Sequence, residues 1–223
     1  MTERPIIFSA PMVRAILADP PLKTQTRRVL KPQPPECDPP IVSKPEWYEP
    51  AVTGKDGEER PGKPVWGIYG DEWGRKIAYQ PGDILWVRET WQHAPVEYCR
   101  CPQPSEASPC DDWSNGTGCR SDRGSVVFRA DGSKHTAGWR SPTHMPRWAS
   151  RTTLRVTDVR VQRLQDISEE DARAEGVHWR DAKVPTFRDA LHLAWDSIHT
   201  KHPEYQWDAN PWVEADTFER VRP

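Results

Sequence analysis

Lys23 and Thr26 stand three residues apart in the segment PLKTQTRRVL, residues 21–30, which contains no acidic side chain. A lysine and a threonine at this spacing can meet in a tight turn, and a threonine hydroxyl becomes a nucleophile only with a base beside it. A lysine can serve as that base when burial favours its neutral form, and it can otherwise neutralise a phosphate. Because the same cations also fit a solvated turn, three interpretations of the segment remain open.

A carboxylate that could complete such a site is Glu175, near the end of the acidic segment DISEEDARAEG, residues 166–176. Ser168 is a plausible N-cap with Asp171 three positions later, and Gly176 is the expected stop, so the segment predicts a short helix. A carboxylate at a helix C-terminus is disfavoured by the helix dipole. Glu175 therefore either faces water or has a cationic partner.

Four of the five cysteines fall in one polar stretch, as Cys99, Cys101, Cys110 and Cys119. In a reduced cytosolic chain, four clustered thiols favour structural zinc over disulfides. The spacing differs from the usual paired Cys-x-x-Cys knuckles, and unligated thiols are the alternative. If all four bind, no coordination position stays open for catalysis, and we expect no organic cofactor.

Arginine and tryptophan alternate in GWRSPTHMPRWASR, residues 138–151, in a chain with 12 tryptophans. This mixture suits base stacking with phosphate contact, although the same residues can pack a loop against the body. We assign substrate contacts to residues of this segment and of two predicted strands: Arg27, Arg28, Arg88, Glu89, Arg140, His144, Arg147 and Trp148.

Alternating and helical apolar patterns predict the elements that must position these residues. Strands are expected at 4–8, 27–31, 84–89, 125–130, 151–164 and 211–221, and helices at 9–19, 166–176 and 186–200. The long strand changes its alternation near Thr157 and Asp158, which indicates a bulge. The separated strands and few helices predict an α+β chain, a small, partly open β-barrel with short helices at its rim. We expect one domain, 1–223, with a proline-rich insertion at 32–79 and a cysteine-containing insertion at 94–124.

The charge balance limits the classes of partner. The 223 residues carry 31 basic and 33 acidic side chains, a net charge of -2, so the chain is not a bulk polycation and any nucleic-acid contact must come from a local patch. No apolar run approaches the ~20 residues that a membrane span needs, and the N-terminus lacks a signal peptide's apolar segment. We therefore expect a cytoplasmic protein without a membrane partner.

The segments KTQTRR, PGDILWVRETW, HMPRWASR and DISEEDARAEG together resemble the ASCH-domain proteins of phages and prophages, which belong to the PUA-like superfamily. The resemblance covers roughly 4–31, 80–92 and 137–221, outside both insertions. It implies a small β-barrel that handles RNA or modified bases, working in the cytoplasm of a bacterial host cell.

One branch of that family consists of small amidohydrolases that remove acetyl groups from acetylated cytidine. Their Lys-x-x-Thr motif matches Lys23 and Thr26, and their helix-end glutamate matches Glu175. The resemblance implies that Thr26 attacks the amide carbonyl, Lys23 takes its proton, and Glu175 orients the lysine or shuttles a proton to the leaving amine.

Three functions remain open from the sequence. The first is a hydrolase acting on the amide bond of an acylated pyrimidine nucleoside or base. The second is a module that binds RNA, single-stranded nucleic acid or a modified base without chemistry. The third is an interaction protein of phage origin that docks through its cysteine-containing insertion.

Overall fold

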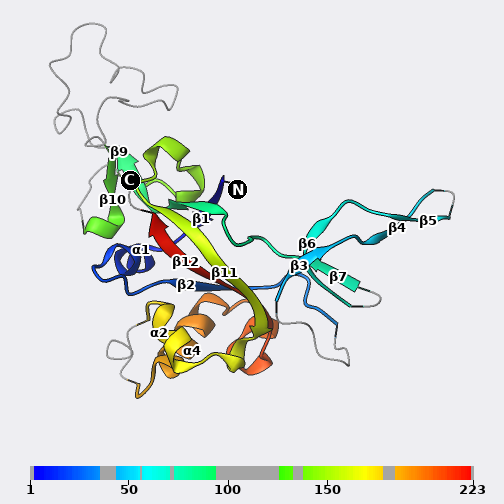
Figure 1. Ribbon diagram of the computed structural model, residues 1–223. Coiled ribbons are helices and arrows are strands. Elements are labelled where there is room, and N and C mark those ends of the chain that lie inside the picture. The colour runs from blue at the N-terminus through cyan, green and yellow to red at the C-terminus, as the bar shows by residue number, and fades with distance from the viewer. Residues whose placement is uncertain are drawn as a thin grey trace, which may run out of the picture.

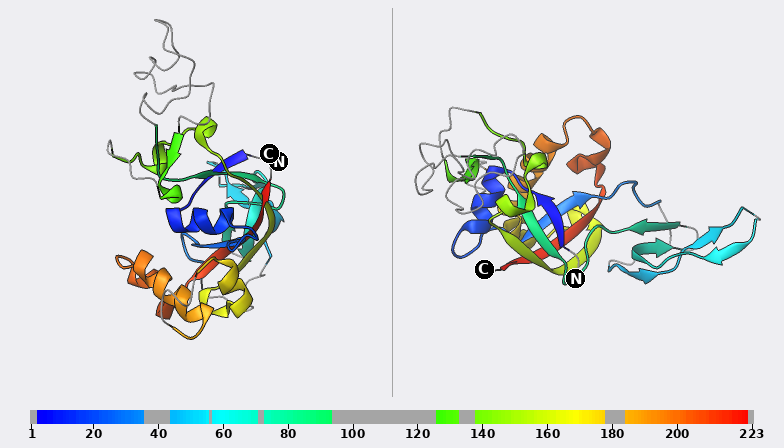
Figure 2. Two further views of the ribbon diagram at one scale, coloured as in Figure 1. Left: turned by 90° about the vertical axis from the view of Figure 1, so that its left-hand side faces the viewer. Right: turned by 90° about the horizontal axis from the view of Figure 1, so that it is seen from above.

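The structure is a computed structural model that describes residues 3–35, 44–55, 57–70, 73–93, 126–132, 138–177 and 184–221. Its body is a five-stranded curved sheet in the order β1-β8-β11-β12-β2 (Figures 1 and 2). The strands are β1 (Glu3–Ile7), β2 (Gln25–Val29), β8 (Ile84–Arg88), β11 (Thr153–Arg163) and β12 (Trp212–Val221). Only β1 and β8 run parallel, and the other neighbours are antiparallel.

The sheet is open, because β1 and β2 are its two edges and are not paired with each other. The described residues therefore form an α+β fold with mostly strands and few helices, and not a closed barrel.

In the described part of the chain, three α-helices flank the sheet: α1 (Ala10–Leu17), α2 (Glu169–Ala174) and α4 (Phe187–Ile198). Short 3-10 turns complete the connections, at Arg129–Asp131, Pro142–His144, Arg147–Ala149, Leu164–Asp166, Pro203–Tyr205 and Trp207–Ala209. Proline at the start of α1 fits a first helical turn, and Ser168 caps α2 by accepting a hydrogen bond from the Asp171 N–H at 3.0 Å. The predicted cap of α2 is thus confirmed.

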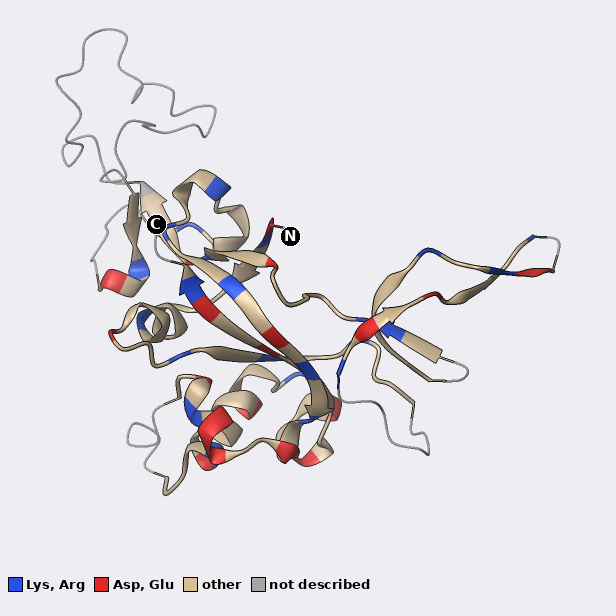
Figure 3. Cartoon of the chain, in the orientation of Figure 1, with Lys and Arg blue, Asp and Glu red and all other residues tan. Residues whose placement is uncertain are grey.

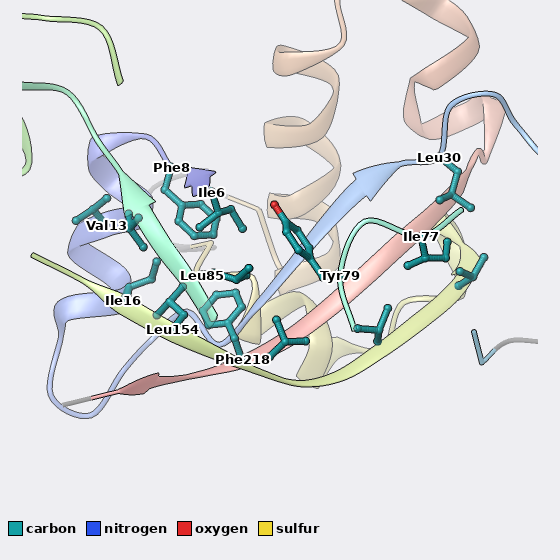
Figure 4. Packing of buried hydrophobic residues seen from close by; sticks show 14 of the residues in the cluster. Ile6, Phe8, Val13, Ile16, Leu30, Ile77, Tyr79, Leu85, Leu154 and Phe218 are labelled. Carbon is teal, nitrogen blue, oxygen red and sulfur yellow. The ribbon is translucent and has the colours of Figure 1, made fainter. Parts of the chain in front are cut away.

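The main core fills the concave side of the sheet (Figure 4). There Val13 and Ile16 of α1 pack on Leu85, Leu154 and Phe218 of three strands. The register of β11 against β12 shifts between Val156 and Asp158, which confirms the predicted bulge. The shift lets β11 keep apolar residues on the concave side along its length, with these buried members: Leu154, Val156, Val159 and Val161.

The opposite face of the sheet carries a second core under α2 and α4. Val213 of β12 packs there with Leu191 and Trp195 of α4 and with Ala172 of α2. Successive side chains of a strand point to opposite faces, so β2 and β12 each divide their residues between the two cores. Polar residues of β2 can therefore contact one another, or residues of neighbouring elements, only when they lie on the same face of the sheet.

The predicted proline-rich insertion forms an arm that projects from the body (Figures 1 and 2). Its strands are β3 (Glu46–Tyr48), β4 (Ala51–Thr53), β5 (Glu59–Pro61), β6 (Val65–Gly70) and β7 (Trp73–Lys76). The order β3-β6-β7 makes one small sheet, and β4 pairs with β5. Both basic and acidic residues are distributed along the arm (Figure 3).

A separate two-stranded sheet pairs β9 (Trp91–His93) with β10 (Val126–Phe128). Arg151 connects this region to the body, because it contacts Glu89 after β8 at 2.9 and 3.1 Å and Asp131 after β10 at 2.8 Å. No helix in the described ranges is long and apolar enough to cross a membrane.

Candidate active site

The turn after α1 brings Lys23 against the end of α2. The N–H groups of Leu22 and Lys23 both donate to Ala15 O, at 2.8 and 3.2 Å, and the backbones of Lys23 and Glu175 form an isolated bridge. Gly176 follows with φ +78°, and a Cβ there would lie 2.8 Å from Lys23 Cβ. Only glycine permits both this backbone conformation and this approach.

The Lys23 side chain is fully buried, and its ammonium nitrogen contacts three oxygens. Lys23 Nζ donates to Gln25 O at 2.7 Å, to Glu175 O at 2.8 Å and to Glu175 Oε2 at 2.9 Å. An ammonium has three N–H donors, so these acceptors use all of them. The predicted contact with Glu175 is therefore present, whereas no donor remains for the Thr26 hydroxyl.

Glu175 holds a second cation with its other oxygen. Arg27 Nη1 lies 2.9 Å from Glu175 Oε1, and Arg27 Nη2 lies 3.2 Å from Asp171 Oδ2. Gln25 also donates to Asp171 Oδ1 at 2.8 Å. Glu175 thus has two buried cationic partners, which is one of the two alternatives expected at a helix end, and Arg27 is engaged by acids of the protein itself.

Asp171 shows how strongly this network favours carboxylates. Burial acts to raise its pKa, but the hydrogen bond from Gln25 and the charges of Arg160 and Arg27 outweigh burial. The pKa of Asp171 therefore lies below its usual value. The acids of α2, visible in red in Figure 3, all lie in the first turn of the helix, and Asp171 among them belongs to this ion-pair network.

The other face of β2 presents a second set of polar residues to the concave side. Thr26 pairs with Asp216 of β12, and Arg28 pairs with Glu214. Tyr79 belongs to the core on the same side (Figure 4), and its hydroxyl donates to Pro5 O at 3.4 Å. The edge strand β2 therefore presents polar side chains on both of its faces.

The two acids on β12 have different surroundings. Glu214 Oε1 accepts the N–H groups of Ala78 and Tyr79 at 3.0 and 3.2 Å. Asp216 has 0% exposure, and neither carboxyl oxygen accepts a hydrogen bond from an N–H or hydroxyl group; its side-chain hydrogen-bond partner is the Glu214 carboxyl. Burial, together with the Glu214 carboxylate, raises the pKa of Asp216 well above its ordinary value, and Arg28 only partly opposes this.

The shifted pKa of Asp216 predicts a change in how stability depends on pH. The native state keeps the Asp216 proton above the unfolded pKa of about 3.9, so the free energy of unfolding falls as pH rises from there to the native pKa. Asp216→Asn removes this decrease, by about 1.4 kcal/mol for each unit of pKa shift. Urea unfolding of both proteins between pH 4 and 8 checks this. The variant must gain stability relative to wild type as pH rises, and parallel curves would contradict the assignment.

A cavity of about 230 Å³ adjoins this region between α1 and the end of β12. Lys23 and Thr24 line it together with Arg220 and Phe218, whereas Thr26 does not. Ligand pockets usually measure roughly 300–1,000 Å³, so this cavity suits a small group rather than a whole nucleoside.

The remaining predicted substrate contacts gather around β8 and β9. Glu89 is buried against Arg151, and Arg88 stacks 4.6 Å from the centre of the Trp86 ring. Arg147 pairs with Glu3 at 2.6 Å. These residues contribute to packing and ion pairing within the protein.

Three further predicted contacts lie on the 138–151 segment. Arg140 stacks over Trp91 at 5.3 Å, and Trp148, which is 44% exposed, meets the same ring edge-on. His144 ends an exposed 3-10 turn. Trp148 and His144 are thus the two of these residues that offer accessible surface.

The predicted zinc ligands, Cys99, Cys101, Cys110 and Cys119, lie outside the described residues. Within the described ranges, no three His, Cys, Asp or Glu residues gather as a metal site. Comparisons with family models, with curated proteins and with solved structures returned no match to this chain.

Proposed function

We propose that this protein is an ASCH-type hydrolase with a PUA-like, partly open barrel, and that it cleaves the amide bond of an acylated pyrimidine nucleoside or base. The observation that carries the proposal is the buried Lys23–Glu175 ion pair, which joins residues 152 positions apart at 2.9 Å. Lys23 also contacts Gln25 O, which belongs to the peptide unit that leads into Thr26. The charged pair thus contacts the backbone directly before Thr26, the residue that is assigned the attack.

A buried lysine with fixed partners is a preorganised positive charge. Such a charge stabilises the oxygen that becomes negative when a nucleophile adds to a carbonyl, because no solvent has to reorganise around it. Thr26 supplies the attacking hydroxyl, and Glu175 fixes the position of Lys23. The substrate class itself comes from the family resemblance.

A non-catalytic module that binds a modified base or single-stranded nucleic acid is the second candidate. The observation that favours it is the occupation of all three Lys23 donors, which removes the lysine from direct proton transfer to or from Thr26 in this arrangement. Trp148 and Arg140 beside Trp91 would then supply stacking and phosphate contact. A structural zinc ion in the cysteine-containing insertion and a bacteriophage origin are compatible with both candidates.

Acetate release from N4-acetylcytidine tests the first proposal. We expect turnover by the wild-type protein and a loss of at least 100-fold for Lys23→Ala, since a preorganised charge at a developing oxyanion contributes about 10²–10³ to the rate. Released acetate and cytidine are measured by chromatography, with circular dichroism to verify that the variant is folded. Binding of the nucleoside without turnover would support the second candidate, and equal rates in both proteins would remove Lys23 from the mechanism.

A further inference from the structure

We propose that Asp216 is the residue that takes the proton from the Thr26 hydroxyl and delivers it to the leaving nitrogen. The inference rests on the proposed hydrolase function and deepens it, because it assigns the proton transfers of that reaction to a residue outside the Lys-x-x-Thr motif. Asp216 lies on β12, far from Thr26 in the sequence and directly opposite it in the sheet.

The register of the two strands supplies the geometry. Residues directly opposite each other in an antiparallel pair have Cβ atoms about 4.5–5.5 Å apart and point to the same face. Thr26 and Asp216 are such a pair, and both side chains are buried, at 5% and 0% exposure. A rotation about the side-chain bonds therefore brings a carboxyl oxygen within hydrogen-bond reach of the hydroxyl.

The partners of Asp216 distinguish it from the other acids near β2. Glu175 is occupied by Lys23 and Arg27, and Glu214 accepts the backbone N–H groups of residues 78 and 79. Asp216 has neither a cation nor an N–H donor on its oxygens, and its side-chain hydrogen-bond partner is the Glu214 carboxyl. Buried acids with strongly shifted pKa values cluster at functional sites.

The charges around Asp216 come from every element that faces it. Arg28 of β2 favours its ionised form, whereas Glu214 of β12 and Glu175 after α2 disfavour it, as does burial. Tyr79, with a pKa raised by burial, stays neutral beside them. The net result is a pKa of Asp216 well above the ordinary value, which makes the carboxylate a stronger base than a solvated aspartate.

The reaction then balances with water as the only co-reactant. The Asp216 carboxylate accepts the Thr26 proton as Oγ1 bonds to the amide carbon, and the carbonyl electron pair moves onto oxygen. When the intermediate collapses, the C–N bond breaks and Asp216 protonates the nitrogen, which leaves an ester on Thr26. Water attacks this ester and gives its proton to Asp216. The C–Oγ1 bond then breaks, Oγ1 recovers that proton, and the acid is released.

Asp216→Asn tests the assignment, since asparagine keeps the shape of the side chain and cannot accept the proton. We expect kcat for N4-acetylcytidine to fall about 10²–10⁴-fold with little change in KM. In the wild type, activity must fall as pH drops through the Asp216 pKa, and this acid limb must vanish in the residual rate of the variant. Glu89→Gln, which changes a buried acid paired with Arg151, is the matched control and should keep the acid limb.

A second measurement does not depend on turnover. Carbon-13 NMR of labelled aspartate carboxyls should show Asp216 titrating above its ordinary value, and Thr26→Val should shift that titration. An ordinary titration would overturn the inference even if acetate is released. If the wild type is active and Asp216→Asn keeps full activity, the role of Asp216 is overturned, whereas the proposed hydrolase function is retained. A wild type that releases no acetate would overturn both.

Discussion

Glu175→Ala is expected to lower the free energy of unfolding by about 3–5 kcal/mol, the usual cost of removing one partner of a buried ion pair. The expected loss lies at the upper end of that range because Glu175 holds two cations, Lys23 and Arg27, whose side chains are 0% and 1% exposed. Both would remain buried without their carboxylate. Urea denaturation followed by tryptophan fluorescence measures the loss directly.

Lys23→Met is the matched control for this prediction. It removes the other end of the same ion pair with a side chain of similar length, but Glu175 keeps Arg27 at 2.9 Å. The order of stability should therefore be wild type, then Lys23→Met, then Glu175→Ala. A reversed order would show that the lysine, rather than the glutamate, holds the network together.

Thr26→Val is expected to reduce acetate release from N4-acetylcytidine by at least about 10³-fold, because the attacking oxygen is absent, while a branched side chain of the same shape remains. Thr26 is buried within an edge strand, and valine fits both the strand and the surrounding space. We therefore expect the variant to unfold at nearly the wild-type urea concentration. Initial rates at saturating nucleoside measure the change in kcat.

Thr24→Val provides the comparison that the chain itself offers. Thr24 lies two residues earlier, next to the same lysine, and lines the cavity beside α1. If Thr26 is the nucleophile, Thr24→Val should change kcat by less than about 10-fold and act mainly on KM. Loss of activity in Thr24→Val with an active Thr26→Val would transfer the attack to Thr24.

The local features of the fold could be predicted from the sequence because they depend on neighbouring residues. The cap of α2 at Ser168, its stop at Gly176 and the bulge between Val156 and Asp158 all appear where the pattern indicated. The strands of the arm were not predicted, since prolines and charges hide their alternation. Pairing within the arm, at the register of Trp47 on Trp66, stabilises strands that are weak by composition.

In the candidate site, too, the features that depend on neighbouring residues were predicted, and those that depend on strand pairing were not. Lys23 and Glu175 were chosen from motif and helix position, and their contact is present. Arg27 was predicted to face a substrate but faces Glu175, because side chains alternate along β2 and Arg27 points toward α2. Asp216 was not predicted, because an acid in an alternating strand resembles a solvated residue. Its burial depends on the pairing of β12 with β2, which no local pattern records.

That pairing has a consequence for synthesis of the protein. In the described sheet, β2 has β12 as its neighbour, and β12 ends at Val221. During translation β2 emerges early and stays unpaired until almost all of the described chain has left the ribosome. A nascent chain that stops before β12 therefore carries Lys23 and Thr26 but not Asp216. The Thr26–Asp216 pair therefore forms only after β12 has been synthesised, and until then β2 lacks its strand partner in the described sheet.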